Sequence, residues 1–132
     1  MKDGLQIDEY GNKRWYLNSK LHREDGPALI HTNGDKMWFL NGNRHREDGP
    51  AVEHTTGYKS WFIHNKRHRA DGPAVEDLDG DTYWFLHNKR HREDGPAIIR
   101  ANSDKEWWLH GEQQTEDEFI LKTSKFWQKV SS

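Results

Sequence analysis

A seven-residue motif dense in ionisable side chains recurs along this chain and is the first place to look for chemistry. HREDGPA stands at 22–28, 45–51 and 91–97, and the stretch 68–74 reads HRADGPA. The motif begins at His22, His45, His68 and His91, a constant spacing of 23 residues. Imidazole, guanidinium and carboxylate groups in one short stretch are the groups that proteins use for metal binding and for proton transfer.

The spacing nevertheless favours a structural role for this motif. Equivalent copies would lie about 10 Å apart in a repeating sheet, whereas a metal ion needs three or four ligands in one sphere. Ala70 also replaces the glutamate in one copy. Asp-Gly-Pro is typical of a corner, with glycine supplying an unusual φ and proline fixing the next one. We therefore predict no catalytic residue, no metal site and no cofactor here, and no enzyme activity.

The composition has to be reconciled with an ordered chain. Only 32% of the 132 residues are hydrophobic and 32% are charged, a balance that leans towards disorder. Five of the seven tryptophans, however, also recur every 23 residues, at Trp15, Trp38, Trp61, Trp84 and Trp107. A repeat array needs only a thin core, because each unit buries its apolar face against its neighbours. The sequence predicts one repeat domain over 1–132.

Each repeat reads as a short apolar segment, a glycine turn and an aromatic segment such as WFL. Asn33-Gly34 between two apolar runs indicates a two-residue primed turn, and Ser103 in the fifth copy predicts a less comfortable one. The aromatic segments are β-favouring and too short for helices. We predict an all-β, elongated antiparallel meander of five hairpins, joined by the HRxDGP corners, at about 5–17, 28–40, 51–63, 74–86 and 97–109.

Alternation along the aromatic segments sorts their side chains into two rows. Trp38 and Leu40 share one face of the strand, and Phe39 lies on the other. If the tryptophans are buried, the second row is exposed and marks an interaction surface. The predicted partner-binding residues are Tyr16, Phe39, Phe62, Phe85 and Trp108, together with Phe126 and Trp127 near the C-terminal end.

The last copy of the motif decays and gives way to a predicted helix. Gln114 stands where the next histidine would fall. Thr115 and Glu118 form a capping-box pattern, and apolar residues then follow at helical spacing. We predict an amphipathic helix over 116–129 that caps the open end of the array, with partner docking as the alternative.

Three further histidines have a place of their own in the repeat. His64, His87 and His110 follow the aromatic segment, where the second copy has Asn41. We expect them to be solvated corner residues. Nine histidines in all predict sensitivity to pH between about 5 and 7.

The unit resembles a MORN-type repeat in a variant that carries HRxDGPA. The resemblance rests on Trp38, Gly42 and His45 at their spacing, and on a second glycine, Gly57, at the hairpin tip. The ordinary unit follows its histidine with Gly-x-Gly, so the match is to a divergent branch. The resemblance implies a twisted hairpin sheet used for protein–protein contacts, and units of this kind resemble those in phage and large-virus proteins.

These observations favour a non-enzymatic protein-binding module, which in a virus would bind and inhibit a host factor. The alternative is a small-molecule or nucleotide sponge that stacks its ligand on aromatic rings. It requires Arg23, Arg46, Arg69 and Arg92 to hold phosphate on the same face as the phenylalanines. A net charge of −2 argues against duplex nucleic acid, and no segment is apolar enough to span a membrane. We expect a cytoplasmic protein without disulfides. Self-association through the unguarded first hairpin is a further alternative.

Overall fold

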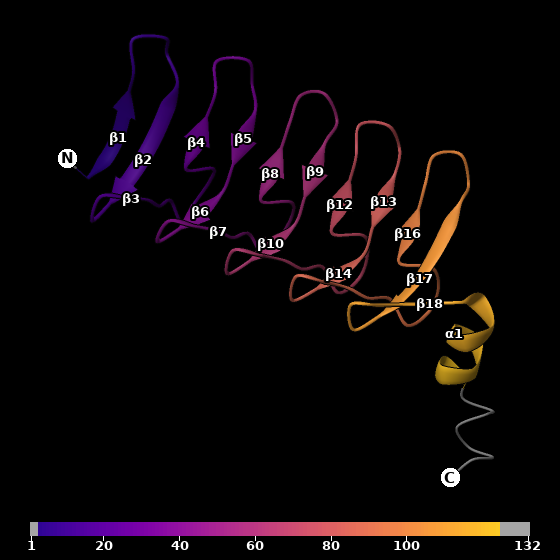
Figure 1. The fold of residues 1–132 in the computed structure, drawn as a ribbon. Coiled ribbons are helices and arrows are strands. Elements are labelled where there is room, and N and C mark those ends of the chain that lie inside the picture. Colours follow the sequence, from indigo (N-terminus) through magenta and orange to yellow (C-terminus); the bar gives the residue numbers. More distant parts are fainter. Residues whose placement is uncertain (1–2, 125–132) are drawn as a thin grey trace.

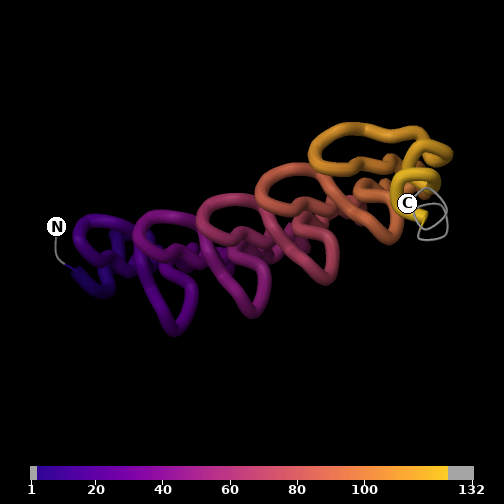
Figure 2. Tube along the Cα trace, turned by 90° about the horizontal axis from the view of Figure 1, so that it is seen from below, coloured from indigo at the N-terminus to yellow at the C-terminus, as the bar shows by residue number. Residues whose placement is uncertain are grey.

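The computed structural model describes residues 3–124, and these form a ladder of five similar units followed by one helix (Figure 1). The units advance in chain order from one end of an elongated body to the other. Figure 2 shows that successive units also rotate relative to one another, so the body is twisted. The predicted all-β meander is confirmed.

Each unit begins with a long hairpin that belongs to one antiparallel sheet. The long hairpins are β1 (Gly4–Ile7) with β2 (Lys13–Leu17), β4 (Leu29–Ile30) with β5 (Lys36–Met37), β8 (Val52–Glu53) with β9 (Lys59–Ser60), β12 (Val75–Glu76) with β13 (Thr82–Tyr83), and β16 (Ile98–Ile99) with β17 (Lys105–Leu109). Each also pairs with the next one along the chain, which gives a continuous meander.

Each unit also contains a short second hairpin, which the sequence analysis read only as a corner. The short hairpins are the end of β2 with β3 (Lys20–Leu21), β6 (Phe39–Leu40) with β7 (Asn43–Arg44), β10 (Phe62–Ile63) with β11 (Lys66–Arg67), β14 (Phe85–Leu86) with β15 (Lys89–Arg90), and the end of β17 with β18 (Glu112–Gln114). They form a second row below the long hairpins in Figure 1. The unit is therefore two hairpins, not one.

The tryptophan of each unit marks the point where the chain passes from the long to the short hairpin. Trp38 donates its backbone N–H to the Ala51 carbonyl at 2.8 Å, and its own carbonyl accepts from the His45 N–H at 3.1 Å. Its bonding partners are thus at the two ends of the next HREDGPA motif, from His45 to Ala51. The same pattern is repeated at Trp15, Trp61 and Trp84.

The two hairpins of a unit have different turns. In the short hairpins both turn residues have positive φ, as in Asn41-Gly42 and His64-Asn65, which is the geometry of a two-residue primed turn. In the long hairpin around Asn33 only Gly34 has positive φ, and His31 and Asp35 close a three-residue loop. The predicted primed turn at Asn33-Gly34 was therefore wrong, because glycine is needed only for the one left-handed residue that ends the loop.

The core is thin and follows the start of each long hairpin. The alanine that ends each motif is fully buried, and the residue after it is buried as well: Ala28 and Leu29, Ala51 and Val52, Ala74 and Val75, Ala97 and Ile98. Cross-strand pairing places Val52 opposite Met37 on one side and Ser60 on the other. Each unit thus buries its apolar residues against its two neighbours.

Side chains at the tips of the long hairpins tie neighbouring units together. Asn12 Oδ1 accepts the backbone N–H of Thr32 at 2.9 Å, and Asp35 Oδ1 accepts that of Thr55 at the same distance. Asp81 Oδ1 repeats the bond to Ala101 at 2.7 Å. The third tip has Tyr58 at this place, and the Leu78 N–H instead bonds to Asp77 of its own tip.

The helix α1 (Glu116–Thr123) closes one end of the array against β17 and β18. Thr115 and Glu118 form the predicted capping box, and Phe119 is buried. The helix α1 ends at Thr123, where Ser124 adopts an extended conformation, and residues 125–129 of the predicted helix lie outside the described residues. Phe126 and Trp127 lie outside the described residues.

Candidate functional site

The arginine of the repeated motif is held in a fixed position on a tryptophan ring. Arg46 Cζ lies 3.8 Å from the centroid of the Trp38 ring. Its Nε donates to Asp48 Oδ1 at 3.0 Å, and its Nη1 donates to the Pro50 carbonyl at 3.1 Å. A Cβ added to Gly49 would lie 2.8 Å from Arg46 Cζ. Gly49 does not have a positive φ, and glycine is required here because the guanidinium fills the space of a side chain.

The same arrangement occurs in all four copies of the motif. The arginine-to-ring distances lie between 3.8 and 4.0 Å for Arg23 on Trp15, Arg46 on Trp38, Arg69 on Trp61 and Arg92 on Trp84. These arginines therefore lie on the tryptophans and not beside the phenylalanines. The condition that the nucleotide alternative placed on Arg23, Arg46, Arg69 and Arg92 is not met.

The histidine of the motif joins one unit to the next. His45 Nδ1 accepts the backbone N–H of His64 at 2.9 Å, and the two imidazole rings are 4.6 Å apart. Its Nε2 lies 3.6 Å from Glu47 Oε1. His22, His68 and His91 accept the equivalent bonds from residues 41, 87 and 110. Within residues 3–124 no group of three or more His, Cys, Asp or Glu side chains is placed to hold a metal ion.

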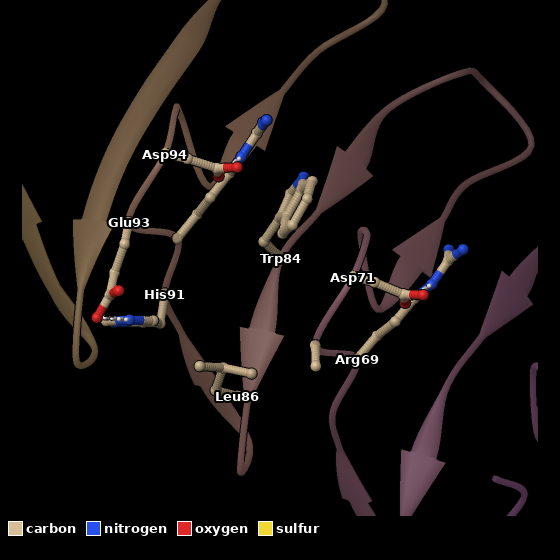
Figure 3. Close-up of a pocket in the computed structure, with 9 residues that line it drawn as sticks. Arg69, Asp71, Trp84, Leu86, His91, Glu93 and Asp94 are labelled. Carbon is tan, nitrogen blue, oxygen red and sulfur yellow. Dashed lines mark hydrogen bonds and ion pairs between the residues drawn. The ribbon is translucent and has the colours of Figure 1, made fainter.

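Between consecutive motifs the surface forms grooves with apolar floors. One groove has a volume of about 390 Å³ and lies between Arg69-Ala70-Asp71 and the motif that begins at His91. Figure 3 shows Trp84 and Leu86 between the two motifs, with the Arg69–Asp71 pair on one side and Asp94 on the other. The floor residues Trp84 and Leu86 are half-buried.

A second groove lies one unit earlier and is built in the same way. It has a volume of about 850 Å³, with Trp61 and Ile63 in place of Trp84 and Leu86. Carboxylates that project into solvent border both grooves. Their side chains are between 76% and 91% exposed, namely Glu47, Asp48, Asp71, Glu93 and Asp94. Each groove is lined by three carboxylates and two motif arginines, so its border carries both charges with a small acidic excess. We call this row of grooves with aromatic and aliphatic floors the groove face.

The second aromatic row, on which the sequence analysis placed partner binding, is less exposed than expected. Phe62 is only 7% exposed and packs in the core with Ala51 and Val52, so it does not present an exposed contact. Tyr16, Phe39, Phe85 and Trp108 are half-buried. These rings are less exposed because side chains of the short hairpins pack against them. The sequence did not reveal the short hairpins, so the exposure was overestimated.

Three arginines of the short hairpins lie among these rings. Arg44 Cζ is 5.3 Å from the Phe62 centroid, Arg67 is 5.7 Å from both Phe62 and Phe85, and Arg90 is 4.9 Å from Trp108. Arg44, Arg67 and Arg90 are not among the site residues predicted from the sequence. Their spacing of 23 residues and the Asn41-Gly42 turn signal between Leu40 and Asn43 could have revealed them.

Comparison with known proteins finds no matching family model and no matching curated protein. In the part of the chain that the structure describes, no helix has the length and apolar character needed to cross a bilayer.

Proposed function

We propose that this chain is a non-enzymatic protein-binding repeat module whose working surface is the groove face. The observation that carries the proposal is the repetition of a built groove between successive motifs, with Trp61 and Ile63 in one and Trp84 and Leu86 in the next. A row of similar grooves suits an extended polypeptide, because successive side chains of the ligand can enter successive grooves.

The chemistry of the grooves selects the ligand. Their floors offer aromatic and aliphatic contact. Their borders carry carboxylates such as Glu47 and Glu93, which are largely exposed although each lies within 3.6 Å of a motif histidine. We therefore propose a partner segment that carries apolar side chains flanked by lysine or arginine. Complementary charge would speed the association and make it sensitive to salt.

One expectation from the sequence and one structural observation support this proposal without testing it. The resemblance to MORN-type repeats implies protein–protein contacts. The ionisable residues of the motif are engaged in structure, because the arginines lie on tryptophans and the histidines accept backbone hydrogen bonds. A host factor as the partner of a viral chain remains part of the proposal.

The test is a selection of extended peptides from a random library on the immobilised protein. We expect the selected peptides to combine lysine or arginine with leucine or aromatic residues, and to bind more weakly at high salt. The double variant Ile63→Ser, Leu86→Ser removes the aliphatic part of both floors while leaving the arginine–tryptophan contacts in place. It should weaken the selected peptides at least about tenfold.

The matched control is the double variant Phe39→Ser, Phe85→Ser, on the opposite face of the strands. Phe85 directly precedes Leu86 in β14, and Phe39 in β6 stands in for its repeat equivalent Phe62, which is too deeply buried to change. Thermal unfolding of both variants shows whether each still folds. Peptides that bind the floor variant unchanged and lose binding to the control would overturn the proposal, and would move the working surface to the phenylalanine row.

A further inference from the structure

The arginines of this protein fall into two sets with different surroundings. The four motif arginines are each paired with an aspartate, as Arg46 is with Asp48 at 3.0 Å. Within residues 3–124, Arg44, Arg67 and Arg90 of the short hairpins form no such ion pair. Nor do Lys66 and Lys89, their exposed neighbours in the same strands. The positive charges of the second set are therefore not neutralised by an ion pair with a described residue.

Arg67 stands out within this set. Its Nε is buried yet has no hydrogen-bond acceptor, although its guanidinium lies between the Phe62 and Phe85 rings. A buried donor without an acceptor costs free energy, and among the described arginines only Arg67 has such an atom.

A pocket joins Arg67 to the next short hairpin. It has a volume of about 470 Å³, and its wall includes Arg67, Lys89 and Arg90 together with the rings of Phe85 and Trp108. None of the described residues that line it is acidic. Glu106 lies within electrostatic reach of Arg90, but it is already bonded to Arg100 at 2.9 Å and to Trp108 Nε1 at 3.1 Å. The pocket thus combines three cations with an aromatic wall.

We infer that this pocket binds a di- or triphosphate group, with Arg67, Lys89 and Arg90 contacting the phosphate oxygens. Guanidinium groups suit phosphate because their N–H groups form two parallel bonds to its oxygens, and lysine adds a point charge. The site lies on the opposite face of the strand from Trp84 and Leu86, so it is separate from the groove face and does not depend on the function proposed for it.

The test is isothermal titration of the whole chain with pyrophosphate and, separately, with adenosine triphosphate. We expect saturable binding of one molecule per chain, since a single pocket holds all three cations. Lys89→Gln should weaken both ligands about tenfold or more. Lys89 is exposed and has no ring contact, so this variant should unfold at the same temperature as the original chain.

Two further variants sharpen the outcome. Arg44→Gln removes the same charge one unit outside the pocket, and binding should survive it. Trp108→Phe gives the ring found in the second, third and fourth units. It should spare pyrophosphate, and weaker binding of the nucleotide alone would identify a base-bearing ligand. The inference is overturned if neither ligand binds, or if Arg44→Gln weakens binding as much as Lys89→Gln, since the ligand would then follow general charge.

Discussion

Arg46 and Trp38 form a stacked pair in which the guanidinium lies 3.8 Å from the centroid of the ring. This pair accounts for the identity of most residues in the repeated motif. Aspartate orients the guanidinium through Nε, the proline carbonyl accepts from Nη1, and glycine leaves the space that the guanidinium occupies. The motif has the composition of an active site, but its structural role is to hold one arginine against one tryptophan.

A double-mutant cycle tests this arrangement. Gly49→Ala should expel the Arg46 guanidinium from the ring and cost about 1–2 kcal/mol in the free energy of unfolding. In the background of Arg46→Ala, the same glycine change should cost much less, because the space is then empty. Urea unfolding of the four proteins measures the coupling. Additive costs would show that Gly49 matters for another reason, such as the backbone conformation.

Ser60 offers a route to a more stable protein. It is fully buried between Val52 and Val75, and its hydroxyl oxygen has no hydrogen-bond partner. Ser60→Ala removes this unsatisfied group and should raise the free energy of unfolding by about 1 kcal/mol. The midpoint of urea unfolding should rise accordingly. A loss of stability of the same size would mean that the hydroxyl has a partner.

Phe62 should behave as a core residue and not as a contact for partners. It is 7% exposed and packs on Ala51 and Val52. Phe62→Ala should cost about 3 kcal/mol in the free energy of unfolding. Phe85→Ala, at the half-buried equivalent position one unit later, is the comparison and should cost less. Small and equal losses of unfolding free energy at the two positions would indicate that both rings are surface residues.

The histidine contacts between units predict a loss of stability in mild acid. Burial, and to a lesser degree the neighbouring His87, lowers the pKa of His68 from its usual 6.5. The folded state therefore holds this imidazole neutral while the unfolded state takes up a proton. The stability that depends on neutral His68 is present above pH 6.5 and is lost as the pH falls below that value. Urea unfolding at pH 7.5 and at pH 5.5 measures the effect.

His87→Asn is the matched variant for this prediction. It recreates the first junction, where His22 Nδ1 accepts from the Asn41 N–H and no second imidazole is stacked. The backbone bond to His68 Nδ1 at 3.1 Å can persist. The variant should lose less stability between the two pH values than the original chain. An unchanged slope would assign the pH dependence to other groups.

The fold could be predicted largely from the sequence because the repeat is strict. The period of Trp38 and His45 gave the number of units, and the alternation of apolar residues gave the long hairpins. The short hairpins were missed because their turn is Asn41-Gly42 in one copy but His64-Asn65 and His87-Asn88 in others, and the histidines conceal the turn pattern.

The groove face was harder to foresee than the fold. Its floors are built from Trp61 or Trp84, which the sequence indicates only as buried, and its openings depend on how far apart consecutive corners lie. Neither the spacing nor the composition shows that Arg69 would cover one face of its tryptophan and leave an open groove beside it. Side-chain geometry of this kind is visible only in the three-dimensional structure.

Among the described residues, the junction between the third and fourth long-hairpin tips lacks the side-chain hydrogen bond that links the other tips. Every other described junction between long-hairpin tips is closed by a side-chain bond such as that of Asp35 to Thr55, but at Tyr58 the opposing Leu78 N–H turns back to its own tip. In a chain of units that touch only their neighbours, the weakest junction sets where the rod divides into independently opening blocks. Amide exchange should therefore report two segments, one on each side of the junction between the third and fourth tips.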